Sequence, residues 1–110
     1  MTNLTEALLQ FQNSQPGTDA YKELKAACLN LIKGDPHNAA AYYLIAGFAR
    51  SYVILHEEEA VTFEMANAAK AQMLDYLRRI ESILTSLSAD ARMSSLNSIV
   101  LDYLQSDKIF

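Results

Sequence analysis

The fold is decided around residues 33–52, which read KGDPHNAAAYYLIAGFARSY. Gly34 suits the left-handed conformation that ends many helices. Asp35 can accept hydrogen bonds from the free amides at a helix start, and Pro36 fits the first helical position. The stretch therefore predicts that one helix ends at Gly34 and that a second begins at Pro36.

The remaining helix breakers also mark boundaries. The chain has three glycines and two prolines in 110 residues, and all but one of them lie in residues 15–17 or 34–36. No segment alternates apolar and polar residues between turn signals, which argues against strands. The apolar share of 51% is that of a folded protein rather than a disordered one. We therefore predict an all-α fold, a compact single-domain bundle of four to five helices over residues 1–110.

Two helices are expected before the junction. Asn3 and Glu6 approximate a capping box, so a first, short helix should run to about Asn13. Thr18 should cap the second helix. The inner face of that helix is predicted to consist of Leu24, Ala27, Cys28 and Leu31.

The third helix should run from Pro36 to about Leu55. Its most regular apolar face consists of Tyr43, Gly47, Phe48, Tyr52 and Leu55. Adjacent residues on a helix point about 100° apart, so Tyr42 and Tyr43 cannot both face the core. We expect Tyr43 to be buried and Tyr42 to be exposed.

A reversal of the chain must follow, because a helix of about 50 residues would be far longer than a small domain is wide. We place it at residues 56–59, where three glutamates would favour the positive end of a new helix. The predicted buried face of that fourth helix consists of Phe63, Ala66, Lys70, Met73, Leu77, Ile80, Leu84 and Leu87. Ser88 should then cap a fifth helix with Asp90 in its first turn. The fifth helix is expected to bury Met93, Leu96, Val100, Tyr103 and Leu104.

Charge and apolar length exclude several classes of partner. The net charge of −4 opposes attraction to phosphate backbones, and the basic residues are scattered, so nucleic-acid binding is not expected. The longest apolar stretch, residues 39–49, is shorter than the roughly 20 residues that span a bilayer, so we expect no membrane segment. A lone cysteine, Cys28, and an N-terminus unlike a signal peptide indicate the cytoplasm.

Catalytic and metal motifs do not emerge. The run His56-Glu57-Glu58-Glu59 lacks the second histidine of a zinc-protease helix, and neither histidine has the glutamate that a di-iron bundle requires three residues before it. Cys28 lies on an apolar helix face, which indicates an inert thiol. We therefore predict a protein that is not an enzyme and that needs no metal or cofactor.

Two features suit protein recognition. The acidic residues Glu57, Glu58, Glu59 and Glu64 would project from one end of the bundle and could meet a basic partner. Tyr42 and Tyr52 are candidate interface anchors, since tyrosine supplies a large contact area at a low entropic cost.

The leading hypothesis is a non-enzymatic helical protein-binding module, such as a small acidic inhibitor or immunity-type protein. The alternative is a self-associating structural bundle, a homodimer formed through Leu74, Tyr76 and Ile83 on a second stripe of the fourth helix. A third option is an enzyme with a pocket among Tyr42, Tyr52 and His56.

One segment resembles a known repeat family. Asp35-Pro36-His37-Asn38, Tyr43, Gly47 and Ala60 together resemble a degenerate tetratricopeptide unit, over about a third of the chain. The spacings from Pro36 to Gly47 and from Gly47 to Ala60 are each one residue too long, and no second copy follows. The resemblance implies close contact between paired helices at Gly47 and Ala60, and a tetratricopeptide-like adaptor as a further alternative.

Overall fold

A computed structural model describes residues 3–86, 88–106 and 110. In this part of the chain it contains helices and no strand, which confirms the all-α prediction. The elements are α1 (Leu4–Asn13), α2 (Thr18–Gly34), the short 3-10 helix η1 (Pro36–Asn38), α3 (Ala39–His56), α4 (Phe63–Ser86) and α5 (Ala89–Gln105).

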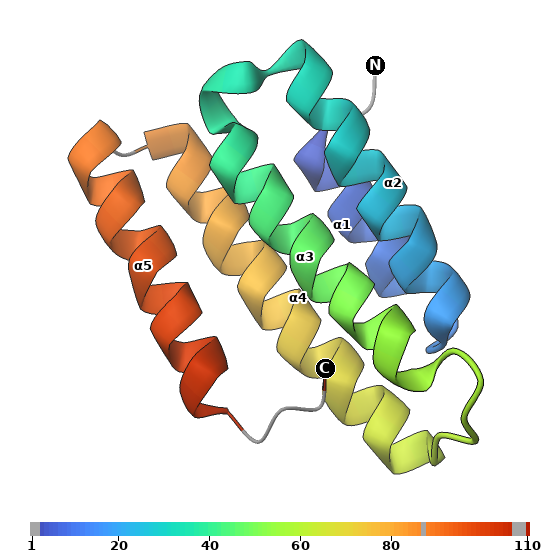
Figure 1. Ribbon diagram of the computed structural model, residues 1–110. Coiled ribbons are helices and arrows are strands. Elements are labelled where there is room, and N and C mark those ends of the chain that lie inside the picture. The colour runs from blue at the N-terminus through green and yellow to red at the C-terminus, as the bar shows by residue number, and fades with distance from the viewer. Residues whose placement is uncertain (1–2, 87, 107–109) are drawn as a thin grey trace.

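Four helices form one layer and the fifth covers its back. Helices α2, α3, α4 and α5 lie side by side in chain order, with neighbours antiparallel, and α1 packs behind them against α2 and α4 (Figure 1). The molecule measures 42 × 33 × 20 Å, so its thinnest dimension corresponds to about two helix diameters. One face of the pair α2 and α3 is therefore left without a covering helix.

Side-chain caps fix two of the helix starts. The Asn3 side chain accepts a hydrogen bond from the Glu6 amide at 2.9 Å, and the Ser88 hydroxyl accepts one from the Ala91 amide at 3.3 Å. Both caps were predicted and are confirmed. The predicted cap at Thr18 is wrong, because Thr18 is already the first residue of α2 and Gly17 precedes it without a side-chain cap.

The junction at residues 34–38 breaks the helix where predicted, but in another way. Gly34 lies within α2 and is not left-handed, and Asp35 ends the helix with φ −143°. The Asp35 carboxylate caps no backbone amide. It accepts hydrogen bonds from the side-chain amide of Asn38 at 2.8 Å and from the Tyr42 hydroxyl at 2.7 Å, and these two bonds lower the pKa of Asp35.

The buried face of α3 differs from the predicted one. Tyr42 is 5% exposed and Tyr43 is 68% exposed, the reverse of the expectation, and Leu55 is also exposed. Tyr42 turns inward because its hydroxyl reaches Asp35. The buried residues are Ala41, Tyr42, Ile45, Ala46, Phe48, Ala49 and Tyr52. Phe48 and Tyr52 are thus buried as predicted. Since α3 lies between α2 and α4, its buried surface is wider than one apolar stripe and also includes small residues.

The tetratricopeptide-like contact positions are likewise exposed. A side chain added at Gly47 would meet no atom within 4 Å, and Ala60 lies in the exposed loop between α3 and α4. Neither residue serves the close helix contact that the resemblance implied.

The chain reverses at the predicted place. Helix α3 ends at His56, and α4 begins at Phe63 after Thr62, whose hydroxyl accepts a hydrogen bond from the Met65 amide at 3.1 Å. The prediction that the three glutamates start the new helix is wrong, since they follow the end of α3 and a threonine caps α4.

Most of the predicted α4 face is buried, with some exceptions. Phe63 is 76% exposed, and Lys70 is partly buried with its ammonium group donating to the Ser14 carbonyl oxygen at 2.6 Å. Leu87 lies outside the described residues. The buried residues of α4 are Ala66, Ala69, Met73, Tyr76, Leu77, Ile80 and Ile83. Because Tyr76 and Ile83 belong to the core and Leu74 is half-buried against it, the second stripe that was to form a dimer does not exist.

Helix α5 is an edge helix, and a residue beyond it completes its packing. Of its described side chains only Ile99 is fully buried, whereas Met93 and Leu104, both predicted to be buried, are exposed. Leu96, Val100 and Tyr103 are half-buried. Phe110 is 1% exposed and joins an aromatic cluster with Phe48, Tyr52, Tyr76 and Tyr103, at ring-centroid distances of 5.8 to 6.5 Å from Phe110. The Tyr103 hydroxyl donates to the Phe110 carbonyl oxygen at 2.7 Å.

Candidate functional site

Neither predicted tyrosine anchor is available at the surface. Tyr52 is 1% exposed, and its ring stacks on that of Tyr21 with a centroid distance of 3.8 Å and an interplanar angle of 12°. Tyr42 is bonded to Asp35. The two residues are separated by about 15 Å along α3, at about 1.5 Å per residue, so they cannot line one pocket with His56. The two tyrosines are therefore not exposed as the expected interface requires, and they do not lie together with His56 as the expected catalytic pocket requires.

The predicted acidic residues are all at the surface. Glu57, Glu58, Glu59 and Glu64 are exposed, the first three directly after α3 and the last in the first turn of α4. Glu57 forms a salt bridge with Lys22 of α2. The other three glutamates of the acidic group, Glu58, Glu59 and Glu64, form no salt bridge among the described residues.

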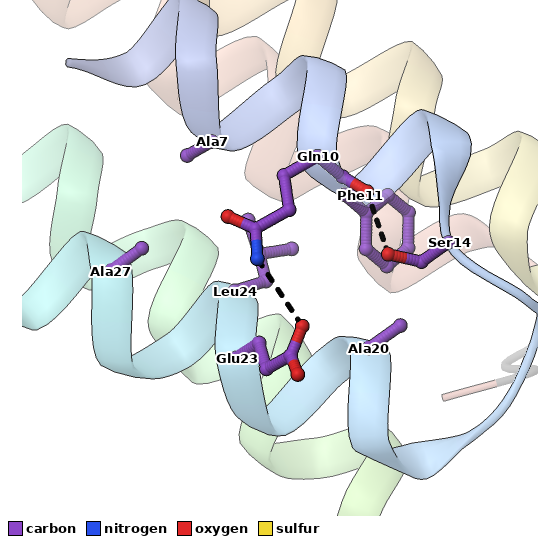
Figure 2. Close-up of a pocket in the computed structure, with 8 residues that line it drawn as sticks. All are labelled: Ala7, Gln10, Phe11, Ser14, Ala20, Glu23, Leu24 and Ala27. Carbon is purple, nitrogen blue, oxygen red and sulfur yellow. Dashed lines mark hydrogen bonds between the residues drawn. The ribbon is translucent and has the colours of Figure 1, made fainter. Parts of the chain in front are cut away.

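A small pocket between α1 and α2 is a packing seam. Figure 2 shows Gln10 of α1 reaching Glu23 of α2, with a nitrogen-to-oxygen distance of 3.4 Å, while the Ser14 hydroxyl donates to the Gln10 carbonyl oxygen at 2.6 Å. The space left is about 10 Å³, enough for about one water molecule. This pocket has no room for a ligand.

A larger depression lies between α2 and α3, and we call it the α2–α3 groove. It encloses about 580 Å³. Its lining residues are Lys22, Lys25, Ala26, Leu29, Arg50, Val53 and Ile54. Ile54 is 65% exposed and Leu29 is also exposed, so the groove combines exposed apolar side chains with three cationic ones.

The groove lies on the face of the layer that α1 does not cover. The residues of α2 that line the seam with α1 are Ala20, Glu23, Leu24 and Ala27. At 100° per residue, the groove residues of α2 lie about half a turn around the helix from these. Since α1 packs on the opposite side of α2, the groove is open to solvent.

The cations of the groove differ in how far they are neutralised. Lys22 binds Glu57 and also lies near Asp19, and the bond to Glu57 is the main cause that raises the pKa of Lys22. In the part of the chain that the structure describes, Lys25 and Arg50 form no salt bridge. An acidic chain therefore carries a local basic surface with two unneutralised cations.

An exposed stripe on α3 continues the groove. Tyr43, Gly47, Arg50 and Ile54 follow one another at spacings of four, three and four, so they share one side of the helix. We call this the α3 stripe. The helical period correctly predicts that Tyr43 and Gly47 share a side, but does not say which side is buried. An arginine in the middle of the stripe was the signal for solvent, because an unpaired arginine is almost never buried.

A second groove, between α4 and α5, is less suited to bind a ligand. It encloses about 450 Å³, and its lining residues are Arg78, Arg79, Ser82, Ile83, Ser95, Ser98 and Ile99. Arg79 is already held by Asp102 at 2.8 Å and by Asp75 at 3.6 Å, and Ile83 and Ile99 are buried. Its two isoleucines are thus less exposed than Leu29 and Ile54 of the α2–α3 groove.

The described residues offer neither a reactive thiol nor a cluster of potential metal ligands. Burial raises the pKa of the Cys28 thiol from 9.0 to about 12, so this thiol is not a nucleophile at neutral pH. No group of three potential metal ligands occurs among residues 3–86, 88–106 and 110, and none of the helices described has the length and apolar character needed to cross a membrane.

Comparisons with known proteins do not bear on the function of this chain. No protein-family model matches the chain, and neither curated proteins nor solved structures show significant similarity to it.

Proposed function

We propose that this protein is a non-enzymatic binding module that docks a partner protein in the α2–α3 groove. One observation carries the proposal: exposed apolar side chains, led by Ile54, line a concave surface where Lys25 and Arg50 have no salt-bridge partner among the described residues. Exposed apolar surface with a polar rim is typical of protein interaction sites.

The shape of the groove favours a protein over a small molecule. Pockets for small ligands usually surround most of the ligand's surface. A trough between two neighbouring helices covers only one side of its occupant, which suits a segment of a protein whose other side stays in water or packs on its own domain.

The acidic group offers a second surface for the same kind of function. The exposed glutamates at positions 58, 59 and 64 would suit a basic partner, as in an acidic inhibitor or immunity-type protein. The groove has exposed apolar side chains, which this group lacks, and so we place the main contact there. A buried single cysteine is consistent with a cytoplasmic location, which we propose with the function.

Site-specific photo-crosslinking in the native host tests the proposal. A photoreactive phenylalanine analogue replaces Ile54 in the groove, and in a matched control it replaces the exposed Gln12 of α1. We expect a discrete adduct with another protein from position 54 only, and its loss when Lys25→Glu and Arg50→Glu are added. Equal adducts at both positions would overturn the proposal. An adduct with a second copy of this chain would favour the self-associating alternative.

A further inference from the structure

The α3 stripe and the groove together have the length of a helix-binding site. The stripe extends from Tyr43 to Ile54, which is about 16 Å along α3 at about 1.5 Å per residue. Across the groove, Leu29 of α2 adds a further exposed apolar side chain. A helix of about three turns, lying over α2 and α3, would cover this surface with a single apolar stripe of its own.

The charges beside this surface select the kind of helix. Lys25 and Arg50 are available to anions of a partner, since no carboxylate of the described chain forms a salt bridge with either. Glu57 shows how a carboxylate binds there: it reaches Lys22, at the end of the groove, from the loop after α3. A partner's carboxylate would have to compete with Glu57 for Lys22.

From these observations we infer that the groove binds an acidic amphipathic α-helix of the partner, and that Glu57 weakens this binding by occupying Lys22. The inference rests on the proposed function and names the chemistry of the partner. The apolar stripe of the bound helix packs on Leu29, Ile54 and Tyr43, and its flanking Asp or Glu side chains meet Lys25 and Arg50. The role of Glu57 is that of an internal competitor and not of a partner contact.

An anionic lipid chain would share these charges but not the geometry. A fatty acid exposes apolar surface all round its chain, and it is held stably only where a cavity encloses most of that surface. The open groove leaves one side of any occupant in water. A helix can present a polar face to that side, and so the helix is the occupant that we favour.

A selection from two matched peptide libraries on the intact 110-residue protein tests the inference. Both libraries display helices of about 15 residues with Leu or Ile at the spacings of one helix face. The flanking positions are Asp or Glu in one library and Lys or Arg in the other. We expect peptides to be enriched from the acidic library alone, and their affinity is then measured for charge variants of the protein.

The variants distinguish local from overall charge. Arg50→Glu should weaken binding of the acidic peptides by on the order of tenfold, whereas Arg78→Glu on α4 makes the same change of net charge and should leave it within about twofold. Glu57→Gln should strengthen binding about two- to fivefold, because it frees Lys22 from an exposed ion pair. Equal effects at positions 50 and 78 would overturn the inference.

The remaining outcomes separate the inference from the proposed function. Enrichment of basic peptides, or of none, overturns the acidic helix, while a crosslinked partner at position 54 would keep the groove as a docking site. Displacement of the selected peptides by sodium dodecanoate below its micelle concentration, with tighter binding than any peptide, would identify a lipid chain as the occupant instead. If position 54 crosslinks to no partner, both the proposed function and the inference of an acidic helix are overturned.

Discussion

Two buried tyrosine hydroxyls should respond in opposite ways to the same substitution. Tyr21 is 1% exposed and its hydroxyl has no hydrogen-bond partner among the described residues, while the Tyr42 hydroxyl donates to the Asp35 carboxylate at 2.7 Å. Replacing each with phenylalanine removes one oxygen and keeps the ring. Tyr21→Phe relieves an unsatisfied group, whereas Tyr42→Phe removes a bond to a charged acceptor.

The size of each change in the free energy of unfolding depends on whether the tyrosine hydroxyl has a hydrogen-bond partner. A hydroxyl buried without a hydrogen bond costs about 1 to 3 kcal/mol, so Tyr21→Phe should raise the free energy of unfolding by about 1 kcal/mol. A hydrogen bond to a charged group contributes about 1.5 to 3 kcal/mol, and Asp35 is partly accessible to water, so Tyr42→Phe should lower the free energy of unfolding by about 1.5 kcal/mol. The two variants should therefore differ by about 2.5 kcal/mol, in a chain where 1 kcal/mol shifts Tm by about 4 °C.

Urea unfolding followed by circular dichroism at neutral pH measures both variants against the wild type. An unchanged dependence of the free energy on urea would show that the compactness of both states is preserved. If Tyr21→Phe destabilised the protein as much as Tyr42→Phe does, the Tyr21 hydroxyl would have a partner in solution, and our description of the packing between α2 and α3 would be refuted at that point.

Three further predictions test other parts of the fold. Phe110→Ala should lower the free energy of unfolding by about 3 to 5 kcal/mol, because it empties the centre of the aromatic cluster. The control Leu104→Ala, on the exposed side of α5, should change it by less than about 0.5 kcal/mol. Equal losses in urea unfolding would contradict the packing of Phe110. Cys28→Ala should make the free energy of unfolding less sensitive to alkaline pH. The unfolded thiol loses its proton near pH 9 and the folded one near pH 12, so the wild type loses stability as the pH rises above 9. Urea titrations at pH 9 and pH 10 should show that the variant loses about 1 kcal/mol less than the wild type between these values. Arg79→Ala should cost less than about 1 kcal/mol, with most of the loss at low salt, because the ion pair with Asp102 that joins α4 to α5 is partly exposed; a loss independent of salt would show that the arginine acts through packing instead.

Local signals predicted the helix boundaries because each boundary depends on residues close in sequence. The caps at Asn3 and Ser88 and the break before Pro36 use neighbours within a few positions. Chain length required a reversal, and the three glutamates placed it after His56, although the residue that caps α4 is Thr62 and not one of them.

The buried faces were less predictable, because they depend on neighbours far along the chain. Tyr42 and Tyr43 are adjacent and equally apolar, and the choice between them follows from the bond to Asp35 and from the position of α3 between two helices. On α5, helical period alone selected Met93 and Leu104, while the aromatic cluster around Phe110 favours the side with Ile99 and Tyr103.

The groove could not be predicted for a related reason. Its cations come from two helices, with Lys25 and Arg50 separated by 25 positions in the sequence, and only the antiparallel packing of α2 on α3 brings them to one surface. Each of them alone is an ordinary surface charge, and composition reports the net charge of −4 but not its distribution.

The distribution of charge gives the groove a property that the overall composition hides. Acidic surfaces elsewhere repel an acidic helix, so an approaching partner is attracted only where Lys25 and Arg50 outweigh the surrounding carboxylates. Salt should weaken both contributions, with opposite effects on the affinity. The weaker attraction at the groove lowers the affinity, and the weaker repulsion from the rest of the molecule raises it. The local term is the less screened because the charges are in contact, and so the affinity of an acidic helix should fall only modestly with salt. The discrimination between acidic and basic helices should persist, because salt first removes the long-range attraction that favours a basic helix. A partner that is selected by charge and held by Ile54 and its apolar neighbours would show this combination.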